Sequence, residues 1–165
     1  MSGTTSVPEI TAHPAVARVR AALASGGARG EIRVLQEAAR TAVQAAEHLG
    51  VDVGQIANSL VFEADGQPLL VLASGIGRVD LGLVAAAIGA TKVRRADPDV
   101  VREHTGFVIG GVAPVGHLHP LTTVVDTHLG SYDVVWAAAG HPHTVFPTTY
   151  DELCRLTGGT PATVR

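Results

Sequence analysis

The chain has 165 residues, of which 46% are hydrophobic and 16% are charged. This length and composition suit one folded domain with a buried core, and they exclude an intrinsically disordered chain. The formal net charge is −3, so the chain has no overall basic field for nucleic acid. DNA is therefore not an expected partner, and any contact with RNA must use a local basic patch.

The sequence has no predicted membrane span or secretory signal, and it has one cysteine. No apolar run reaches the length of a membrane span, and the N-terminus lacks the basic-then-apolar pattern of a secretory signal. The expected location is therefore the cytoplasm, with no membrane partner. Cys154 is the single cysteine, which excludes an intrachain disulfide and a metal cluster built on cysteines.

Helices and strands are intermixed along the chain, after an N-terminal segment of residues 1–13 that is expected to be frayed and flexible. Helices are predicted where apolar residues recur at helical spacing before a glycine, and strands where short apolar or β-branched runs occur. In chain order, the pattern predicts helix 14–25, strand 31–35, helix 41–49, strands 59–63 and 68–73, helices 79–88 and 97–103, strands 121–125, 132–138 and 144–146, and helix 149–156.

Local signals support several of these boundaries. Asp65-Gly66 between two strand-like runs is typical of a hairpin. Asp97 followed by Pro98 favours the start of a helix. Hairpins mixed with helices predict one α/β domain, residues 1–165, with a mixed sheet that is not doubly wound.

The segment between the predicted helix 97–103 and the strand 121–125 is unusually rich in glycine. Residues 105–119 read Thr-Gly-Phe-Val-Ile-Gly-Gly-Val-Ala-Pro-Val-Gly-His-Leu-His. Gly110 and Gly111 can adopt backbone angles closed to other residues, and Pro114 fixes its own φ. Such a loop can present backbone N–H groups to a carbonyl or a phosphate. On spacing alone, a tight connection between strands is the commoner meaning of such a segment.

Several motifs together resemble the YbaK/ProX family of aminoacyl-tRNA deacylases in their order and spacing. The resemblance covers roughly residues 30–160, and the Gly-Gly-x-x-Pro-x-Gly element is its most specific part. The motifs that carry it are Asn58-Ser-Leu-Val-Phe62, Leu69 to Ala73, Arg78-Val-Asp80, Ala96-Asp-Pro98, Thr105-Gly-Phe107, Gly110-Gly-Val-Ala-Pro-Val-Gly116, Val134 to Gly140 and Asp151-Glu-Leu-Cys-Arg-Leu156.

This resemblance implies a fold and an activity. The implied fold is a curved mixed sheet, partly closed like a barrel and surrounded by helices. The implied activity is hydrolysis of the ester between an amino acid and the 3′-terminal adenosine of a misacylated tRNA, without a cofactor. An aminoacyl-tRNA synthetase is a further implied partner. A synthetase pocket distinguishes two amino acids that differ by one methylene by only about 1–3 kcal/mol of binding free energy. A second, hydrolytic step is therefore needed to remove the wrong amino acid from the tRNA.

The resemblance also implies a site. In such a site the glycine loop holds the ester carbonyl and the developing oxyanion, and water is the nucleophile. Gly110, Gly111 and Asn58 are the implied catalytic residues. The implied substrate pocket is lined by Phe62, Val112, Ala113, Pro114, Gly116, His117, Ala138 and Gly140.

Two departures from the family pattern bear on activity. Asn58 stands where a lysine is expected to contact the tRNA end, and asparagine donates hydrogen bonds but carries no charge. Ala138 and Ala139 stand where the late strand often carries a serine. Arg78 and Lys92 are candidates to replace the lost charge. The alternative function is a non-catalytic module of the same fold that binds tRNA or an aminoacyl ligand.

The histidines suggest a further alternative. Five of the eight lie between His117 and His143, in part as two His-x-His pairs. On strands, each pair would share one face, and four rings could bind zinc. Pro120 and Pro142 interrupt strand geometry, and no carboxylate or cysteine has diagnostic spacing, so no metal site is predicted.

Overall fold

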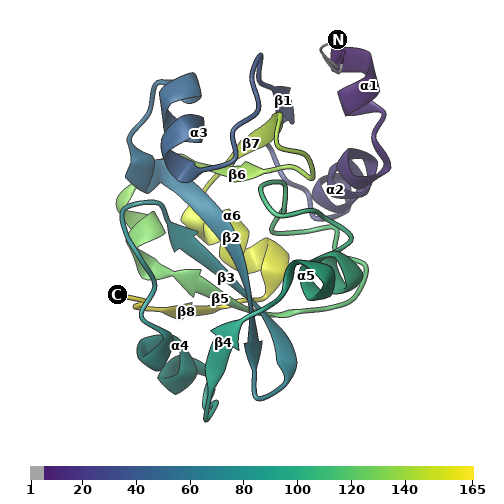
Figure 1. Ribbon diagram of the computed structural model, residues 1–165. Coiled ribbons are helices and arrows are strands. Elements are labelled where there is room, and N and C mark those ends of the chain that lie inside the picture. Colours follow the sequence, from purple (N-terminus) through teal and green to yellow (C-terminus); the bar gives the residue numbers. More distant parts are fainter. Residues whose placement is uncertain (1–5) are drawn as a thin grey trace.

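The structure, a computed structural model, describes residues 6–165 (Figure 1). Within them, eight strands pair into one sheet in the order β1-β7-β6-β2-β3-β5-β8, with β4 pairing with β2 beside this path. Both parallel and antiparallel pairs occur, so the predicted mixed α/β fold is confirmed. The strands are β1 (Arg33–Val34), β2 (Ile56–Ala64), β3 (Gln67–Ser74), β4 (Val93–Arg95), β5 (Thr122–Asp126), β6 (Val135–Ala138), β7 (Thr144–Thr148) and β8 (Thr160–Ala162).

Six α-helices and two short 3-10 helices lie around this sheet (Figure 1). Four of the helices end at a glycine in the left-handed conformation. The sequence predicts this end at Gly50, Gly89 and Gly158, whereas the helix that ends at Gly106 is two residues longer than predicted. No helix within residues 6–165 has the length and apolar character needed to cross a membrane. The helices are α1 (Val7–Thr11), α2 (Pro14–Ser25), α3 (Ala42–Leu49), η1 (Val53–Gln55), α4 (Leu81–Ile88), α5 (Pro98–Thr105), η2 (Thr127–Ser131) and α6 (Tyr150–Thr157).

The expectation of a frayed start is wrong for residues 6–13, whereas residues 1–5 lie outside the described part. α1 begins with a capping box in which Ser6 and Glu9 exchange hydrogen bonds. Ile10 anchors this helix, since its side chain is only 1% exposed. Strands β4 and β8 were also not predicted, because three residues are too short to show a period.

Strand β3 separates two buried layers. Its alternate residues Leu70 and Leu72 join the cluster that contains Phe107 and Phe146, whereas Leu69, Val71 and Ala73 face a second cluster against α4. Both faces of the sheet are therefore covered at this point. This burial on both sides explains why β3 reads as a continuous apolar run and not as an alternating one.

One edge of β2 is left partly open. β3 pairs with β2 along its whole length, but on the other edge β6 reaches only Ile56 and Ala57, and β4 pairs with residues 62–64. The carbonyl oxygen of Ile56 accepts a hydrogen bond from the N–H of Gly75, just after β3, so the main-chain groups of Ile56 point towards β3. Successive residues of a strand point their main-chain groups to opposite edges, and Ser59 is three residues further on. Its N–H and C=O groups therefore point away from β3. These groups face the gap between β6 and β4.

Candidate functional site

A cavity of about 520 Å³ lies over this gap in the edge of β2. Its walls come from the start of α3, from β2, β6 and β7, and from the loop that follows α5. The polar side chains that line it are Arg40, Thr41, Asn58, Ser59, Arg95 and Thr144. No aspartate, glutamate, histidine, cysteine or lysine is among the described residues that line it. The lining therefore offers no side chain suited to act as a general base, and its serine and threonine hydroxyls have no base among the lining residues to activate them as nucleophiles.

The loop reaches the cavity through a tight turn at residues 108–111. Gly111 donates its N–H to the carbonyl oxygen of Val108 at 3.0 Å, and Gly110 has a φ of +94°. A positive φ at the third position is typical of a type II turn and explains the glycine there. The Gly111 N–H is used inside the turn. The N–H groups of Gly110 and Val112 have no backbone acceptor within residues 6–165, so both amides are available to a ligand.

Arg18 of α2 holds both ends of the glycine loop. Its Nη2 donates to the carbonyl oxygen of Gly106 at 2.8 Å, and its Nε donates to that of Gly116 at 3.3 Å. The guanidinium also lies 5.1 Å from the centroid of the Phe107 ring. A guanidinium that bridges two carbonyls ten residues apart fixes the loop between them, and Arg18 is therefore a positioning residue.

Four of the predicted site residues come together. Asn58, Gly110, Val112 and Ala138 all line the cavity, although β2, the loop and β6 are distant in sequence. The side chain of Asn58 is half-buried and forms no hydrogen bond with the described residues. It is therefore free to bind a ligand.

Phe62 lies close by, at a smaller cavity of about 170 Å³. This smaller cavity shares Ser59, Leu60, Arg95, Ile109, Gly110 and Val112 with the larger one, so the two spaces adjoin. Apart from Ser59 and Arg95, its lining is apolar. Ser59 also has a buried hydroxyl oxygen without a hydrogen-bond partner in the described part of the chain.

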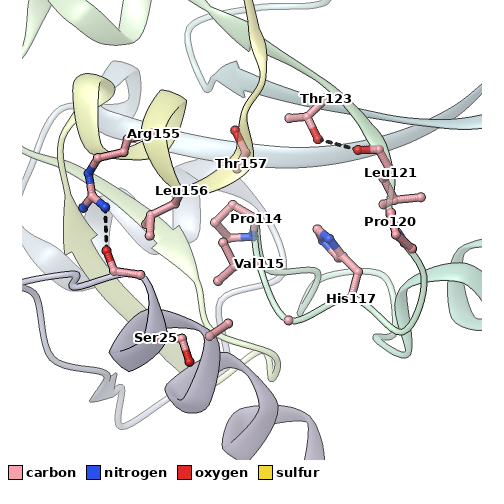
Figure 2. Close-up of a pocket in the computed structure, with 13 residues that line it drawn as sticks. Ser25, Pro114, Val115, His117, Pro120, Leu121, Thr123, Arg155, Leu156 and Thr157 are labelled. Atoms are coloured by element: carbon pink, nitrogen blue, oxygen red, sulfur yellow. Dashed lines mark hydrogen bonds between the residues drawn. The ribbon is translucent and has the colours of Figure 1, made fainter.

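The second half of the glycine loop does not line this cavity, although the sequence analysis places both halves in one pocket. Pro114, Gly116 and His117 border a separate cavity of about 520 Å³ between the ends of α2 and α6 (Figure 2). The physical reason is that Ala113 is fully buried in the core. The chain therefore passes through the core between Val112 and Pro114, and its two halves emerge in different places.

In the second cavity, the imidazole of His117 lies opposite Arg155 and Leu156 of α6, with Pro114 between them (Figure 2). The Nε2 atom of His117 is 2.7 Å from the carbonyl oxygen of Ala113 and therefore donates to it. Burial lowers the pKa of His117, partly offset by this hydrogen bond and reinforced by the charge of Arg18. His117 therefore stabilises the glycine loop from the side of the second cavity, through its hydrogen bond to Ala113.

Two further predicted residues have packing roles. A Cβ on Gly111 would lie 3.0 Å from the Cα atom of His141, and one on Gly140 would lie 2.9 Å from the carbonyl carbon of Ala15. Both glycines therefore allow close approach of two backbones. Neither Gly111, Gly140 nor the buried Ala113 is among the residues that line the cavity.

The charge of the cavity comes from residues that the sequence analysis missed. Arg40 and Arg95 line it, whereas Arg78 and Lys92 do not. Within residues 6–165, neither Arg40 nor Arg95 forms a salt bridge. Arg94, the neighbour of Arg95, pairs with Glu63 at 2.7 Å. Alternation along β4 could have indicated that Arg95 points to the other face, but no local pattern marks Arg40.

The two His-x-His pairs do not converge on one site. The ring of His119 lies 6.1 Å from that of His104, and the ring of His117 lies 5.8 Å from that of Phe107. His141 and His143 neighbour each other elsewhere, 5.5 Å apart. Within residues 6–165, no group of three or more histidine, cysteine or carboxylate side chains is arranged to hold a metal ion.

Comparisons with known proteins show which sequences and structures this chain resembles. The uncharacterised protein YwhH of Bacillus subtilis is 33% identical over 124 residues, which cover 74% of this chain and 78% of YwhH. The proline–tRNA ligase of Lactobacillus gasseri is 40% identical over 97 residues, which are 56% of this chain but 17% of the ligase. The chain thus matches only a small part of that synthetase.

A crystal structure proposed to be a trans-editing enzyme for prolyl tRNA synthetase is 43% identical to this chain. It has a TM-score of 0.86, and the match covers 92% of this chain and 97% of that one. The family model described as the aminoacyl-tRNA editing domain matches residues 36–156, which include every wall of the cavity. The chain therefore belongs to the aminoacyl-tRNA editing domain family.

Proposed function

We propose that this protein hydrolyses the ester bond of misacylated tRNA in trans, and that the cavity over the edge of β2 is its active site. The observation that carries the proposal is the meeting of two free backbone amides with two unpaired arginines in one cavity. The similarity to proline–tRNA ligases and to a proposed trans-editing enzyme for prolyl tRNA synthetase favours tRNA for proline as the partner.

The arginines account for recognition of the RNA end. Arg40 and Arg95 rise from different walls of the cavity, and its described lining has no carboxylate to neutralise them. The chain has a net charge of −3, so contact with RNA requires a local basic patch, and these two arginines provide one. The exposed apolar side chain of Ile109, which also lines the cavity, suits the terminal adenine.

The chemistry follows from the turn at residues 108–111. When water attacks the ester carbonyl, negative charge develops on the carbonyl oxygen, and the N–H groups of Gly110 and Val112 are suited to bind it. The described lining offers no general base to activate its serine and threonine hydroxyls. The protein therefore contributes binding, orientation and oxyanion stabilisation, and water supplies the nucleophile.

The adjoining cavity of about 170 Å³ is the proposed pocket for the amino-acid side chain. Val61, Phe62, Ala96 and Val101 give it mainly apolar walls. A dry apolar cavity of roughly 150 Å³ can hold a molecule as large as benzene. The pocket therefore suits a small or medium apolar side chain, while the ester lies at the junction of the two cavities beside Gly110.

The alternative function is a non-catalytic module that binds tRNA or an aminoacyl ligand. The observation that favours it is Asn58, which lines the cavity at the position of the family's lysine and carries no charge. In this case the two arginines still bind the 3′ end of the RNA, but the ester is not hydrolysed. Both functions use the same cavity and are separated by measuring turnover.

A deacylation assay on a panel of mischarged tRNAs tests the proposal, together with binding of a short RNA that ends in CCA. We expect hydrolysis of at least one misacylated tRNA for proline. Arg95→Gln is expected to weaken binding and to reduce the slope of log K against log salt by about 0.7, since one contact to a single strand is lost.

Arg94→Gln is the matched control, because its guanidinium pairs with Glu63 and is not among the residues that line the cavity. Binding of the CCA-ending RNA without hydrolysis of any tRNA would support the non-catalytic alternative. Absence of both binding and hydrolysis would contradict both functions. Equal losses of RNA affinity in Arg94→Gln and Arg95→Gln would show that the cavity does not bind the RNA.

A further inference from the structure

Three histidine rings form a cluster beside the glycine loop. His13 precedes α2, and His141 and His143 lie in the turn between β6 and β7. The ring centroids of His13 and His141 are 5.6 Å apart, and those of His141 and His143 are 5.5 Å apart. His141 packs against Gly111 of the glycine loop. The cluster therefore borders the turn that carries the free amides.

Arg40 joins the histidines on the cavity side. The Cα atom of Arg40 is 3.8 Å from the position of a Cβ on Gly110. The N–H of the preceding residue, Ala39, donates to the carbonyl oxygen of Pro142 at 2.8 Å. The segment before α3 is thus tied to the histidine turn, so Arg40 and the cluster form one continuous surface.

Hydrogen bonds determine which ring nitrogens carry the proton in the neutral rings. The Nδ1 of His13 accepts from the N–H of Ala15 at 3.1 Å, and the Nδ1 of His141 accepts from the N–H of His143 at 3.0 Å. An accepting Nδ1 puts the proton of a neutral ring on Nε2. Each of the two rings therefore offers an Nε2–H donor for which residues 6–165 provide no acceptor.

The Nδ1 of His143 lies 3.0 Å from the carbonyl oxygen of Leu35 and so must donate to it. A neutral His143 therefore has no proton on Nε2 and offers a donor there only when it is charged.

The charges around His141 are not balanced by a carboxylate. Burial lowers the pKa of His141 most, followed by the charges of His143, His13 and Arg40. Each of these neighbours is a base, and none of the groups that shift this pKa is acidic. Glu37, on the segment before α3, instead lies 3.9 Å from Nε2 of His48. A surface with several potential cations and no counter-charge favours an anion.

We propose that His13, His141 and Arg40 form an anion subsite that binds one phosphate of the RNA strand entering the cavity. This inference rests on the proposed function and names the group that the rim of the same site recognises. Phosphate binding brings negative charge next to the imidazole rings, so it is coupled to protonation of the histidines. RNA therefore binds more tightly as the pH falls, and deacylation of dilute substrate increases in the same direction.

Histidine side-chain NMR gives the direct test. The protein is titrated in pH without ligand, with inorganic phosphate, and with a short RNA ending in CCA. We expect both ligands to raise the pKa of His141, the RNA at a far lower concentration, and to leave His104 and His119 unchanged. Between pH 7.5 and 5.5, affinity for the RNA is expected to rise about threefold to tenfold.

The variants His13→Asn and His141→Asn remove the Nε2 donors while retaining local structure. Asparagine is a preferred N-cap, and its side-chain oxygen accepts from the N–H two residues later, as each Nδ1 does here. Each variant is expected to weaken RNA binding about fivefold at pH 5.5 and much less at pH 7.5, where a neutral ring loses only one donor. His119→Asn is the matched control, because its ring pairs with His104 elsewhere.

Three results would overturn the inference. The first is an unchanged pKa of His141 with both ligands. The second is a response to inorganic phosphate but not to the RNA, which would indicate a site for free phosphate. The third is an unaltered pH dependence of RNA binding in the two variants. If the wild type instead shows the NMR response but hydrolyses no mischarged tRNA, the subsite stands and the proposed catalysis fails.

Discussion

Replacing Gly110 by alanine tests whether the turn at residues 108–111 supplies the donors of the cavity. Gly110 has a φ of +94°, and the nearest atom to an added Cβ would be the Cα of Arg40, at 3.8 Å. There is room for the methyl group, so the cost comes from the backbone angle alone and amounts to about 1–2 kcal/mol. For a chain of this length, that corresponds to a fall in Tm of about 2–8 °C.

The same variant is expected to lose activity far beyond this stability loss. To relieve the strain, the turn must rotate the two peptide groups on either side of residue 110. One of them carries the N–H of Gly110, and the other carries the N–H of Gly111 that closes the turn, so the Gly110 donor loses its alignment. Loss of one aligned oxyanion donor lowers the rate about a hundredfold or more. Single-turnover deacylation with excess enzyme measures this step directly, and thermal unfolding measures the stability loss separately.

Gly66→Ala is the matched control for this prediction. Gly66 has a φ of +82° at the tip of the β2–β3 hairpin, with no atom within 4 Å of an added Cβ. It carries a similar backbone cost but lies outside the cavity lining. If both variants lose similar stability and Gly110→Ala still deacylates at the wild-type rate, the turn does not provide the oxyanion donors and the mechanism is refuted.

Three further predictions concern the cavity and the loop behind it. Asn58→Lys adds a charge to the cavity and is expected to tighten RNA binding, with a salt slope steeper by about 0.7 in a filter-binding titration; an unchanged slope would mean that residue 58 does not reach the RNA. In Arg18→Lys, the lysine cannot bridge the carbonyls of Gly106 and Gly116. We expect the free energy of unfolding, measured with denaturant, to fall by about 1.5–3 kcal/mol and deacylation to slow; unaltered values of both would show that the two hydrogen bonds of Arg18 are dispensable. The pKa of His117 is lowered from 6.5 by burial, so the unfolded chain binds the proton more readily, and the stability that this group contributes is full above pH 6.5 and is lost as the pH falls towards the folded pKa. His117→Gln keeps a donor for the carbonyl of Ala113 and should make the unfolding free energy less dependent on pH between 7.5 and 5.5, and equal pH dependence in both proteins would contradict this assignment.

The sequence by itself determined the local structure. α3 runs from its cap at Thr41 to the left-handed Gly50, as predicted, because capping hydrogen bonds and glycine conformation involve residues only a few positions apart. The hairpin at Asp65-Gly66 follows from the same kind of local signal. The motifs of residues 58–62 and 105–116 likewise indicated the family, and they identified Asn58 and Gly110 as neighbours in the fold.

Only the tertiary structure decided the shape and charge of the site. The gap in the edge of β2 exists because β6 and β4, from distant parts of the chain, each pair with a different end of that strand. Arg40 and Arg95 reach one cavity only through this pairing. The burial of Ala113 splits the glycine loop between two cavities. Strand partners and core positions depend on contacts between segments far apart in sequence, and a local pattern carries no information about which distant surface it will meet.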